Sequence, residues 1–214
     1  MTERPTPVDR PWEQPSSADT TALGTRAAHR LAELCACEIR PGLTEAELAY
    51  LERQHGFEFA DDHRAFLAAG LPVSPTSAGG HGFPNWRDDP RLLRKQLRWP
   101  VEGILFDIEF AEFWVKAWGL RPRDTGPALR MALRNLASAP QMVPIYAHRY
   151  LPAGRGSHGH PVLSMWRSDI TCAAPDLAAY IDREFAGWPE AEHLQPDADP
   201  EVTVPFWREL MSLQ

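Results

Sequence analysis

Two carboxylates near the middle of the chain, Asp107 and Glu109, stand two residues apart in the segment VEGILFDIEF. Apolar and polar side chains alternate along this segment, which predicts a strand with one buried face and both acids on the opposite face. A carboxylate pair can supply a general acid and a base or nucleophile. The same pair can form a solvated strand face, or meet a basic protein through charge complementarity. No nucleophile motif lies nearby in the sequence, so we favour the two non-catalytic interpretations.

Four further residues have the chemistry of metal ligands: His148, His158, His160 and Asp169. Imidazole and carboxylate groups suit zinc or iron, so convergence of these side chains would create the metal centre of a small metal-dependent enzyme. Their spacing matches no established metal motif, however, and the loop GSHGH has the composition of a polar turn. We therefore expect no metal and no other cofactor, and keep the metal enzyme as an alternative.

The sequence lacks the standard catalytic signatures. Ser157 and Ser164 lie in neither a GxSxG nor an SxxK motif, and no glycine-rich segment matches a P-loop or a dinucleotide fingerprint. The three cysteines, Cys35, Cys37 and Cys172, do not have the paired spacing of a structural zinc site. Their odd number forms no disulfide framework and suits a reducing compartment. We therefore expect the protein not to be an enzyme.

The chain contains eight tryptophans, and two of them lie just beyond the acidic segment. Trp114 and Trp118 stand four residues apart, a spacing that places both rings on one face of a turn or short helix. Tryptophan is enriched at protein interfaces because it combines a large apolar area with an indole N–H donor. We predict that these two residues contact a protein partner beside the carboxylate pair, whereas Trp99 and Trp166 pack in the core.

The composition is that of an ordinary globular chain of 214 residues, 43% hydrophobic and 24% charged. The formal net charge of −7 argues against a general nucleic-acid binder and favours a basic partner. No stretch approaches the roughly 20 apolar residues of a membrane helix, and the opening residues lack a secretory signal. We expect a cytoplasmic protein without membrane contact.

The apolar spacing predicts a mainly helical chain. Thr44 and Glu47 form a capping box for the second helix, which Gly56 should end in a left-handed conformation. The predicted helices run from Leu23 to the Pro41–Gly42 stop, over 44–55, over 61–69, from Asp124 to Pro140, from Asp176 to Phe185, and around Phe206, Trp207 and Leu210.

Three strands are expected between these helices: 101–110, 142–152 and 160–170. The last two would form an antiparallel hairpin, with Pro144 at a sheet edge or a strand start. Residues 71–90 are rich in proline, glycine and serine, which predicts a long surface loop. The expected fold class is α+β, a single domain over residues 21–186 with helices on one face of a small, mainly antiparallel sheet. A flexible proline-rich arm over 1–20 precedes it, and an acidic linker with a short helix over 187–214 follows it.

Several segments, taken in order, carry a family resemblance: LTEAELAYLERQHGFEFADDHRAFLAAGLP, FPNWR, WPVEGILFDIEFAEFW with WGLRP, VPIYAHRYLP, and HPVLSMWRSDI before DLAAYIDREF. Over roughly residues 43 to 185 the chain resembles the SUKH superfamily, which includes the fungal cell-wall assembly regulator and many bacterial immunity proteins. It departs from that pattern at Ala60, where a proline is usual, and at Thr171–Pro175, where a tyrosine-rich stretch is usual.

The resemblance implies an α+β domain that acts by direct protein contact, as bacterial members neutralise polymorphic toxins, and it implies no enzymatic activity. It also places Trp86, Asp107, Glu109 and Trp118 in motif regions of a partner surface. We therefore expect a non-catalytic immunity protein whose partner is a protein, in particular a basic toxin domain. A regulatory scaffold without a toxin partner is the alternative that shares every sequence feature.

Overall fold

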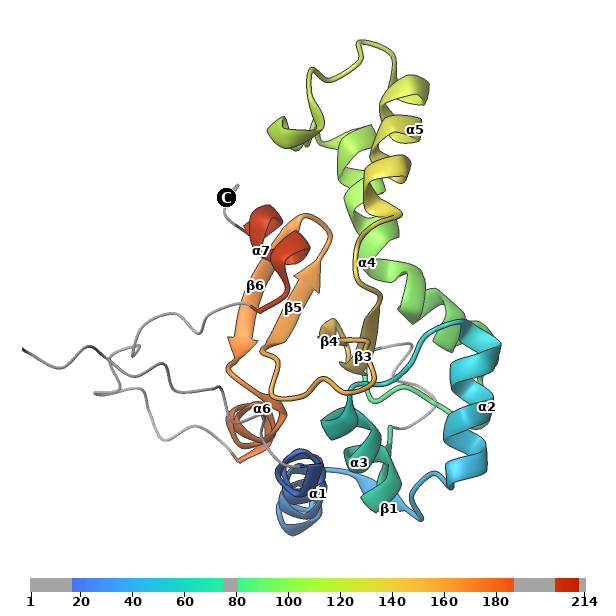
Figure 1. The fold of residues 1–214 in the computed structure, drawn as a ribbon, viewed down its shortest axis with the longest axis vertical. Coiled ribbons are helices and arrows are strands. Elements are labelled where there is room, and N and C mark those ends of the chain that lie inside the picture. Colours follow the sequence, from blue (N-terminus) through green and yellow to red (C-terminus); the bar gives the residue numbers. More distant parts are fainter. Residues whose placement is uncertain (1–16, 75–80, 187–202, 212–214) are drawn as a thin grey trace, which may run out of the picture.

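A computed structural model describes residues 17–74, 81–186 and 203–211. These residues form helices packed around small antiparallel sheets, which confirms the predicted single-domain α+β fold class (Figure 1). The predictions for residues 1–16, for 75–80 in the loop and for the acidic linker over 187–202 lie outside the described residues. Residues 17–20 were expected in the arm, but they begin the first helix. None of the helices in the described ranges combines the length and apolar character that a membrane span needs.

The helices largely follow the predicted spacing. Thr44 and Glu47 form the expected capping box, and Gly56 ends that helix with φ of 71°. Asp176 caps the helix that follows the sheet by accepting from the amide of Ala179. The α-helices are α1 (Ser17–Glu33), α2 (Glu45–His55), α3 (Asp61–Ala69), α4 (Pro90–Phe110), α5 (Thr125–Leu136), α6 (Leu177–Phe185) and α7 (Pro205–Met211), and η2 (Lys116–Trp118) is a 3-10 helix.

The first helix ends earlier than predicted. After α1, Cys35 adopts a positive φ of 48°, and strand β1 (Glu38–Arg40) then pairs antiparallel with β2 (Leu71–Val73). The residues just before Pro41 are therefore extended, which suits the steric restriction on a residue that precedes proline. Strand β2 likewise occupies the start of the segment that was expected to be a loop.

The main sheet has four strands in the order β3-β4-β5-β6: β3 (Met142–Tyr146), β4 (Arg149–Pro152), β5 (Val162–Trp166) and β6 (Asp169–Ala174). Each of the two predicted strands is thus a hairpin in itself, closed by a two-residue turn. Ala147 and Arg167 begin these turns with positive φ, 47° and 59°. Neither turn contains glycine or asparagine, so the usual hairpin signal is missing. Pro144 lies on edge strand β3, as predicted.

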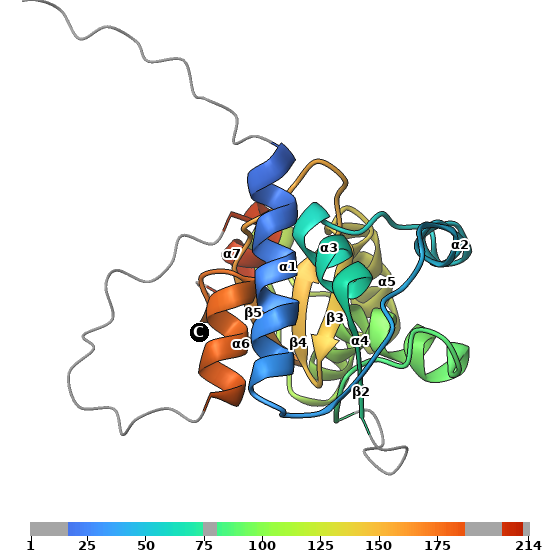
Figure 2. The ribbon, with the colours of Figure 1, turned by 90° about the horizontal axis from the view of Figure 1, so that it is seen from below.

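Helices cover both faces of this sheet, not one face as expected. Val143, Leu151 and Val162 point into a first core with α1, α2, α3 and α6. Met142, Tyr150 and Leu163 point into a second core with α4, α5 and α7. Figure 2 shows α1, α3 and α6 in front of the strands, with α4 and α5 behind them. The period-two alternation of a strand therefore places neighbouring residues in different cores.

The largest correction concerns residues 101–110, which form the second half of helix α4 and not a strand. Ile104 and Ile108 are buried four residues apart, while Phe106 and Phe110 are exposed four residues apart. A spacing of four returns to the same face of a helix, so the alternation fits a helix as well as a strand. The burial pattern of the whole helix, with Leu93, Gln96, Leu97, Pro100, Gly103 and Asp107 also buried, has the helical period.

Pro100 lies inside α4, where it cannot donate to the carbonyl of Gln96 four residues earlier. The hydroxyl of Tyr150 on strand β4 donates to that carbonyl instead, at 3.0 Å. The side-chain amide of Gln141 similarly donates to the carbonyl of Leu97, at 3.0 Å. Side chains from the sheet and from the residue just before it thus satisfy two backbone carbonyls in the proline-containing turn of the helix. For this reason α4 can continue through Pro100.

Candidate functional site

The predicted carboxylate pair does not exist as a pair. Asp107 is buried and accepts hydrogen bonds from the backbone amide and the hydroxyl of Ser168, at 2.9 and 2.7 Å. The guanidinium of Arg167 lies 3.8 Å from its other oxygen. Glu109 is exposed on another side of α4. Asp107 therefore holds the β5–β6 turn against α4 and is not available for a partner.

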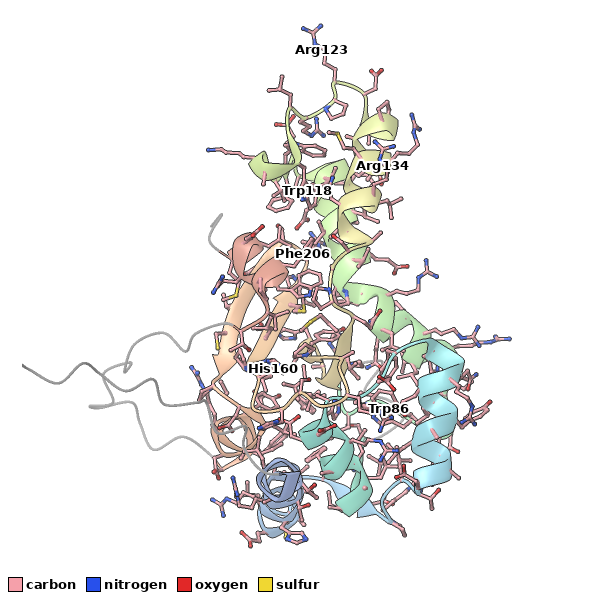
Figure 3. The ribbon with its side chains drawn as sticks, viewed as in Figure 1. Trp86, Trp118, Arg123, Arg134, His160 and Phe206 are labelled. Carbon is pink, nitrogen blue, oxygen red and sulfur yellow. The ribbon has the colours of Figure 1, made fainter. Side chains whose placement is uncertain are left out.

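Trp86 is internal and not a partner contact, because it is only 4% exposed. Its ring packs edge-on against Phe59 and His63, with centroid distances of 5.2 and 6.3 Å. Figure 3 shows Trp86 in the body of the molecule near α2 and α3, far from the labelled Trp118. The five residues predicted to bind a partner therefore do not share one surface.

Trp114 and Trp118 do come together, as their spacing predicted. Their rings lie perpendicular to each other, with centroids 5.6 Å apart, and the indole N–H of Trp114 donates to the carbonyl of Gly119 at 2.7 Å. Both side chains are half-buried against the second core. They belong to a projection formed by the end of α4, η2 and α5, which we call the helical projection (residues 104–136; Figure 1). Their main contacts are thus internal to the helical projection.

The four candidate metal ligands do not gather into one group. His148 packs edge-on against Trp166, with ring centroids 5.7 Å apart, whereas His160 contacts the hydroxyl of Thr203 at 2.6 Å. Burial lowers the pKa of both imidazoles. Within residues 17–74, 81–186 and 203–211, no three side chains of the ligand types gather as a metal site would require. The structure therefore does not bring these four residues together as one metal centre.

The loop that contains His158 and His160 has a structural role. Asp62 is fully buried at the start of α3 and accepts from the backbone amide of Gly159 at 2.9 Å. Asp61 accepts from the amide of Gly156 at 3.0 Å, and the backbone amide of Asp61 donates to the carbonyl of Ser157. These bonds fix the GSHGH loop to the first turn of α3. Burial raises the pKa of Asp62, since two backbone donors only partly replace water.

Four aromatic side chains and one arginine gather where α4 meets the β5–β6 turn, in a set that we call the aromatic strip: Trp99, Phe106, Phe110, Trp166 and Arg167. The rings of Trp99 and Trp166 are 5.6 Å apart, and those of Phe106 and Phe110 are 4.7 Å apart. The guanidinium carbon of Arg167 lies 4.2 Å from the centre of the Phe106 ring, as in a cation–π contact. Positions 99, 106 and 110 share one face of the helix, so the strip is continuous along α4.

The strip is exposed to an unusual degree for large apolar side chains. Phe106, Phe110 and Trp166 are 40%, 65% and 45% exposed. Gly103 permits the close approach of the β5–β6 turn, because a Cβ atom there would lie 2.8 Å from Cα of Arg167. That approach brings Trp166 and Arg167, about 60 residues away in sequence, beside the phenylalanines of α4.

A cavity of about 210 Å³ opens at the Trp99 end of the strip. It lies between α4 on one side and the β3–β4 turn, β4 and β5 on the other. Its lining includes Lys95 and the rings of His81, Trp99, His148, Tyr150 and Trp166. Gln96 also lines it and is only 6% exposed, yet neither its amide nitrogen nor its amide oxygen has a hydrogen-bond partner among the described residues. A buried amide without partners is energetically unfavourable. Both amide atoms are closed to solvent, so they lie behind the wall of the cavity and not on its surface.

The charge beside this cavity is positive, although the whole chain carries −7. Arg91, Arg94, Lys95 and Arg98 line a shallow depression on α4 with a single acid, Glu102. Glu102 pairs with Arg98 at 2.8 Å. Among the described residues, the other three cations form no ion pair. The first half of α4 therefore presents uncompensated positive charge next to the aromatic strip.

Sequence reasoning missed most of this site. Trp99 and Trp166 were expected in the core. Trp99 is half-buried and packs against the second core, whereas Trp166 is 45% exposed, and both belong to the strip. Phe106 was assigned to the buried face of a strand, yet it is exposed on a helix. The run PRLLRKQLRW was the available signal, because its cations at 91, 94, 95 and 98 have helical spacing.

No family model matches the chain, and neither a curated protein nor a solved structure matches it significantly. The resemblance to the SUKH superfamily therefore stays a prediction from the motifs.

Proposed function

We propose that this domain acts without catalysis by binding another protein through the aromatic strip of α4 and the β5–β6 turn. The observation that carries the proposal is the exposure of Phe106, Phe110 and Trp166 in one contiguous row. Aromatic and arginine side chains are the residues that dominate binding energy at protein interfaces. A row of them left open to water is a marker of an interaction surface.

The structure also explains how this surface can be rigid before binding. Arg167 is held between the Phe106 ring and the buried carboxylate of Asp107, and the turn that carries it is bonded to α4 through Ser168. Side chains that are already ordered lose little conformational entropy when a partner binds. The strip thus has the properties expected of a preorganised contact.

The resemblance to immunity proteins motivates the finer proposal that the partner is a toxin, which this domain neutralises by contact. The expected position of that contact changes, because Asp107 is buried and Trp86 is internal. The overall charge of −7 favours a partner with net positive charge, whereas the cations of α4 favour an acidic segment at this particular contact. A regulatory scaffold would use the same surface and would differ in its partner.

Site-specific photocrosslinking tests the surface. A photoreactive phenylalanine analogue replaces Phe110 in the full chain expressed in its source cell, and replaces Tyr50 on α2 in a matched control, since Tyr50 is also an exposed aromatic residue. We expect a discrete crosslinked protein from position 110 that is absent from position 50. The double variant F106A/F110A should reduce capture by at least about tenfold, in line with two interface hot spots.

Equal crosslinking from both positions would reject the strip as the binding surface. If the captured protein is a toxin, co-expression with the wild-type domain should restore growth, and co-expression with F106A/F110A should not. Growth restored equally by both would show that neutralisation does not use this surface.

A further inference from the structure

We propose that the cavity at the Trp99 end of the strip binds a small aromatic carboxylate, a ligand with one planar ring and a single negative charge. This inference goes beyond the proposed function, because it needs no protein partner. It follows from the size of the cavity, the accessible rings and the cation that line it, and the lack of any acid in its described lining.

The size of the cavity limits its ligand to about one ring with a short substituent. Its volume is about 210 Å³. Sites for drug-sized ligands typically measure about 300–1,000 Å³, whereas an apolar cavity of about 150 Å³ already admits one benzene molecule. The space therefore suits a benzene ring that carries one small group.

The rings that line the cavity are accessible to a ligand. Trp166 is 45% exposed, and Trp99 and His148 are half-buried. The Trp166 ring is inclined at 49° to that of Trp99 and at 73° to that of His148, with centroids 5.6 and 5.7 Å apart. The indole N–H of Trp99 donates to the carbonyl of Met165 at 3.3 Å, which holds that ring in place. Rings at several inclinations offer a further ring the offset and edge-on contacts that aromatic groups prefer.

The charge at the cavity decides which kind of aromatic ligand fits. Aromatic walls alone would also suit a cation, which is attracted to the faces of the rings. Lys95, however, lines both the cavity and the neighbouring depression that contains Arg91 and Arg94. It is exposed, and no acid among the described residues forms an ion pair with it. The described lining of the cavity contains no Asp or Glu, so a cation would be repelled and a carboxylate attracted.

The two histidines of the lining do not reverse this preference. Burial holds the pKa of His148 below its ordinary value, so this imidazole is neutral near pH 7, and His81 is exposed. Glu184 and Asp169 are close enough to act on the pKa of His148 in the opposite direction, but neither lines the cavity. Within the described lining, Lys95 is therefore the charged group that a carboxylate would meet near pH 7.

Three small probes test the ligand class: benzoate, its neutral counterpart benzamide, and the cation benzyltrimethylammonium. Each is titrated at low salt into the full chain labelled with ¹⁵N, and the indole N–H signals of the eight tryptophans are followed by NMR. Trp99→Phe and Trp166→Phe assign two of these signals by their disappearance. We expect benzoate to shift both signals and to bind about fivefold more tightly than benzamide, the upper range for an exposed ion pair. The cation should bind more weakly than benzamide.

A lysine variant tests the source of the charge preference. Lys95→Met should remove the preference for benzoate over benzamide and leave the affinity for benzamide unchanged. Lys116→Met, at an exposed lysine of η2, is the matched control and should keep the preference. High salt should reduce the preference in the wild-type protein, because exposed charges are screened.

Cyclohexanecarboxylate tests the role of the ring, because it carries the same charge without aromaticity. It should bind about threefold more weakly than benzoate, since aromatic pairs gain affinity beyond their buried area. Equal binding of benzoate and benzamide by the wild-type protein would overturn the proposal, even if Lys95→Met failed to fold. So would tighter binding of the cation, benzoate binding that leaves the Trp99 and Trp166 signals unshifted, or no binding of any probe.

These outcomes are separable from those for the proposed function, because the titrations contain no partner protein. Loss of partner capture in F106A/F110A together with an unselective cavity would reject only the carboxylate site. Selective benzoate binding together with unchanged partner capture would reject only the strip as the protein contact.

Discussion

At the scale of single residues, burial decided the roles that residue type alone left open. Asp107 has the chemistry of a catalytic or partner-binding acid. One of its carboxylate oxygens, however, accepts two hydrogen bonds from Ser168, and the other lies 3.8 Å from the guanidinium of Arg167. Gln96 has unremarkable chemistry, yet it is the buried amide without a partner at the cavity. What each side chain can do therefore depends on groups that are distant in sequence.

His63 makes a prediction about acid stability at the same scale. It is fully buried beside Phe59 and Trp86, its ring nitrogens have no partners among the described residues, and burial lowers its pKa to about 3. Between pH 3 and 6.5, the ordinary pKa of histidine, the unfolded chain binds a proton at His63 that the folded chain does not bind. The free energy of unfolding should therefore fall as the pH falls below 6.5, by up to about 1.4 kcal/mol per pH unit.

Urea unfolding between pH 7 and pH 5 measures this effect. His63→Leu should remove about 2 kcal/mol of the loss expected over that range, compared with the wild-type protein. The raised pKa of Asp62 acts in the opposite direction, since it lowers stability as the pH rises, and it is present in both proteins. Parallel pH profiles for the two proteins would show that His63 is not the group responsible.

At the scale of elements, close approach between backbones outweighs the intrinsic preference of a helix. Gly24 lies inside α1, where alanine would normally be favoured by roughly 1 kcal/mol. A Cβ atom at this position would collide with the backbone carbonyl of Asp62 and lie 2.8 Å from the amide nitrogen of Phe66. The contact of α1 with α3 therefore depends on the absence of a side chain.

We predict that Gly24→Ala destabilises the protein by roughly 1–3 kcal/mol, the range typical of overpacking. Gly126, in the first turn of α5, is the matched control, because a Cβ atom there would meet only the flexible end of Arg130 at 3.5 Å. Gly126→Ala should leave stability unchanged or raise it. Chemical denaturation of both variants measures the difference, and an equal loss in both would contradict the role assigned to the α1–α3 contact.

At the scale of the whole molecule, the four-stranded sheet separates two cores that different helices complete. The first core includes α1, α3, α6 and the first half of α4, and the second includes the second half of α4, α5 and α7. Trp207 of α7 is buried in the second core and donates its indole proton to the carbonyl of Pro140 at 3.0 Å. This contact ties the C-terminal helix to the segment that joins the helical projection to the sheet.

We predict that Trp207→Ala lowers stability by about 3–5 kcal/mol, as expected for a large aromatic side chain removed from a core. Amide hydrogen exchange should quicken mainly in the second half of α4, in α5 and in α7, because regions of one fold can open separately. Phe206→Ala, at the half-buried neighbour, should have a smaller effect. An equal loss of protection in α1, α3 and α6 would show that the two cores unfold as one unit.

Local signals were sufficient where the determining contacts lie within a few residues. The capping box of Thr44 and Glu47, the left-handed stop at Gly56, the pairing of Trp114 with Trp118 and the edge position of Pro144 all follow from the sequence. Each depends on backbone bonds or side-chain spacing that the nearest residues supply, so tertiary packing did not need to be known.

Only the tertiary structure decided the identity of α4 and of the site. The pairs Ile104/Ile108 and Phe106/Phe110, each four residues apart, are compatible with a strand and with a helix. The continuation of α4 through Pro100 depends on Tyr150 and Gln141. The strip likewise requires the β5–β6 turn to reach α4 over Gly103. The sequence alone determined which elements could form locally. The partners that bury Asp107 and leave Phe110 exposed come from distant segments, which meet only in the folded chain.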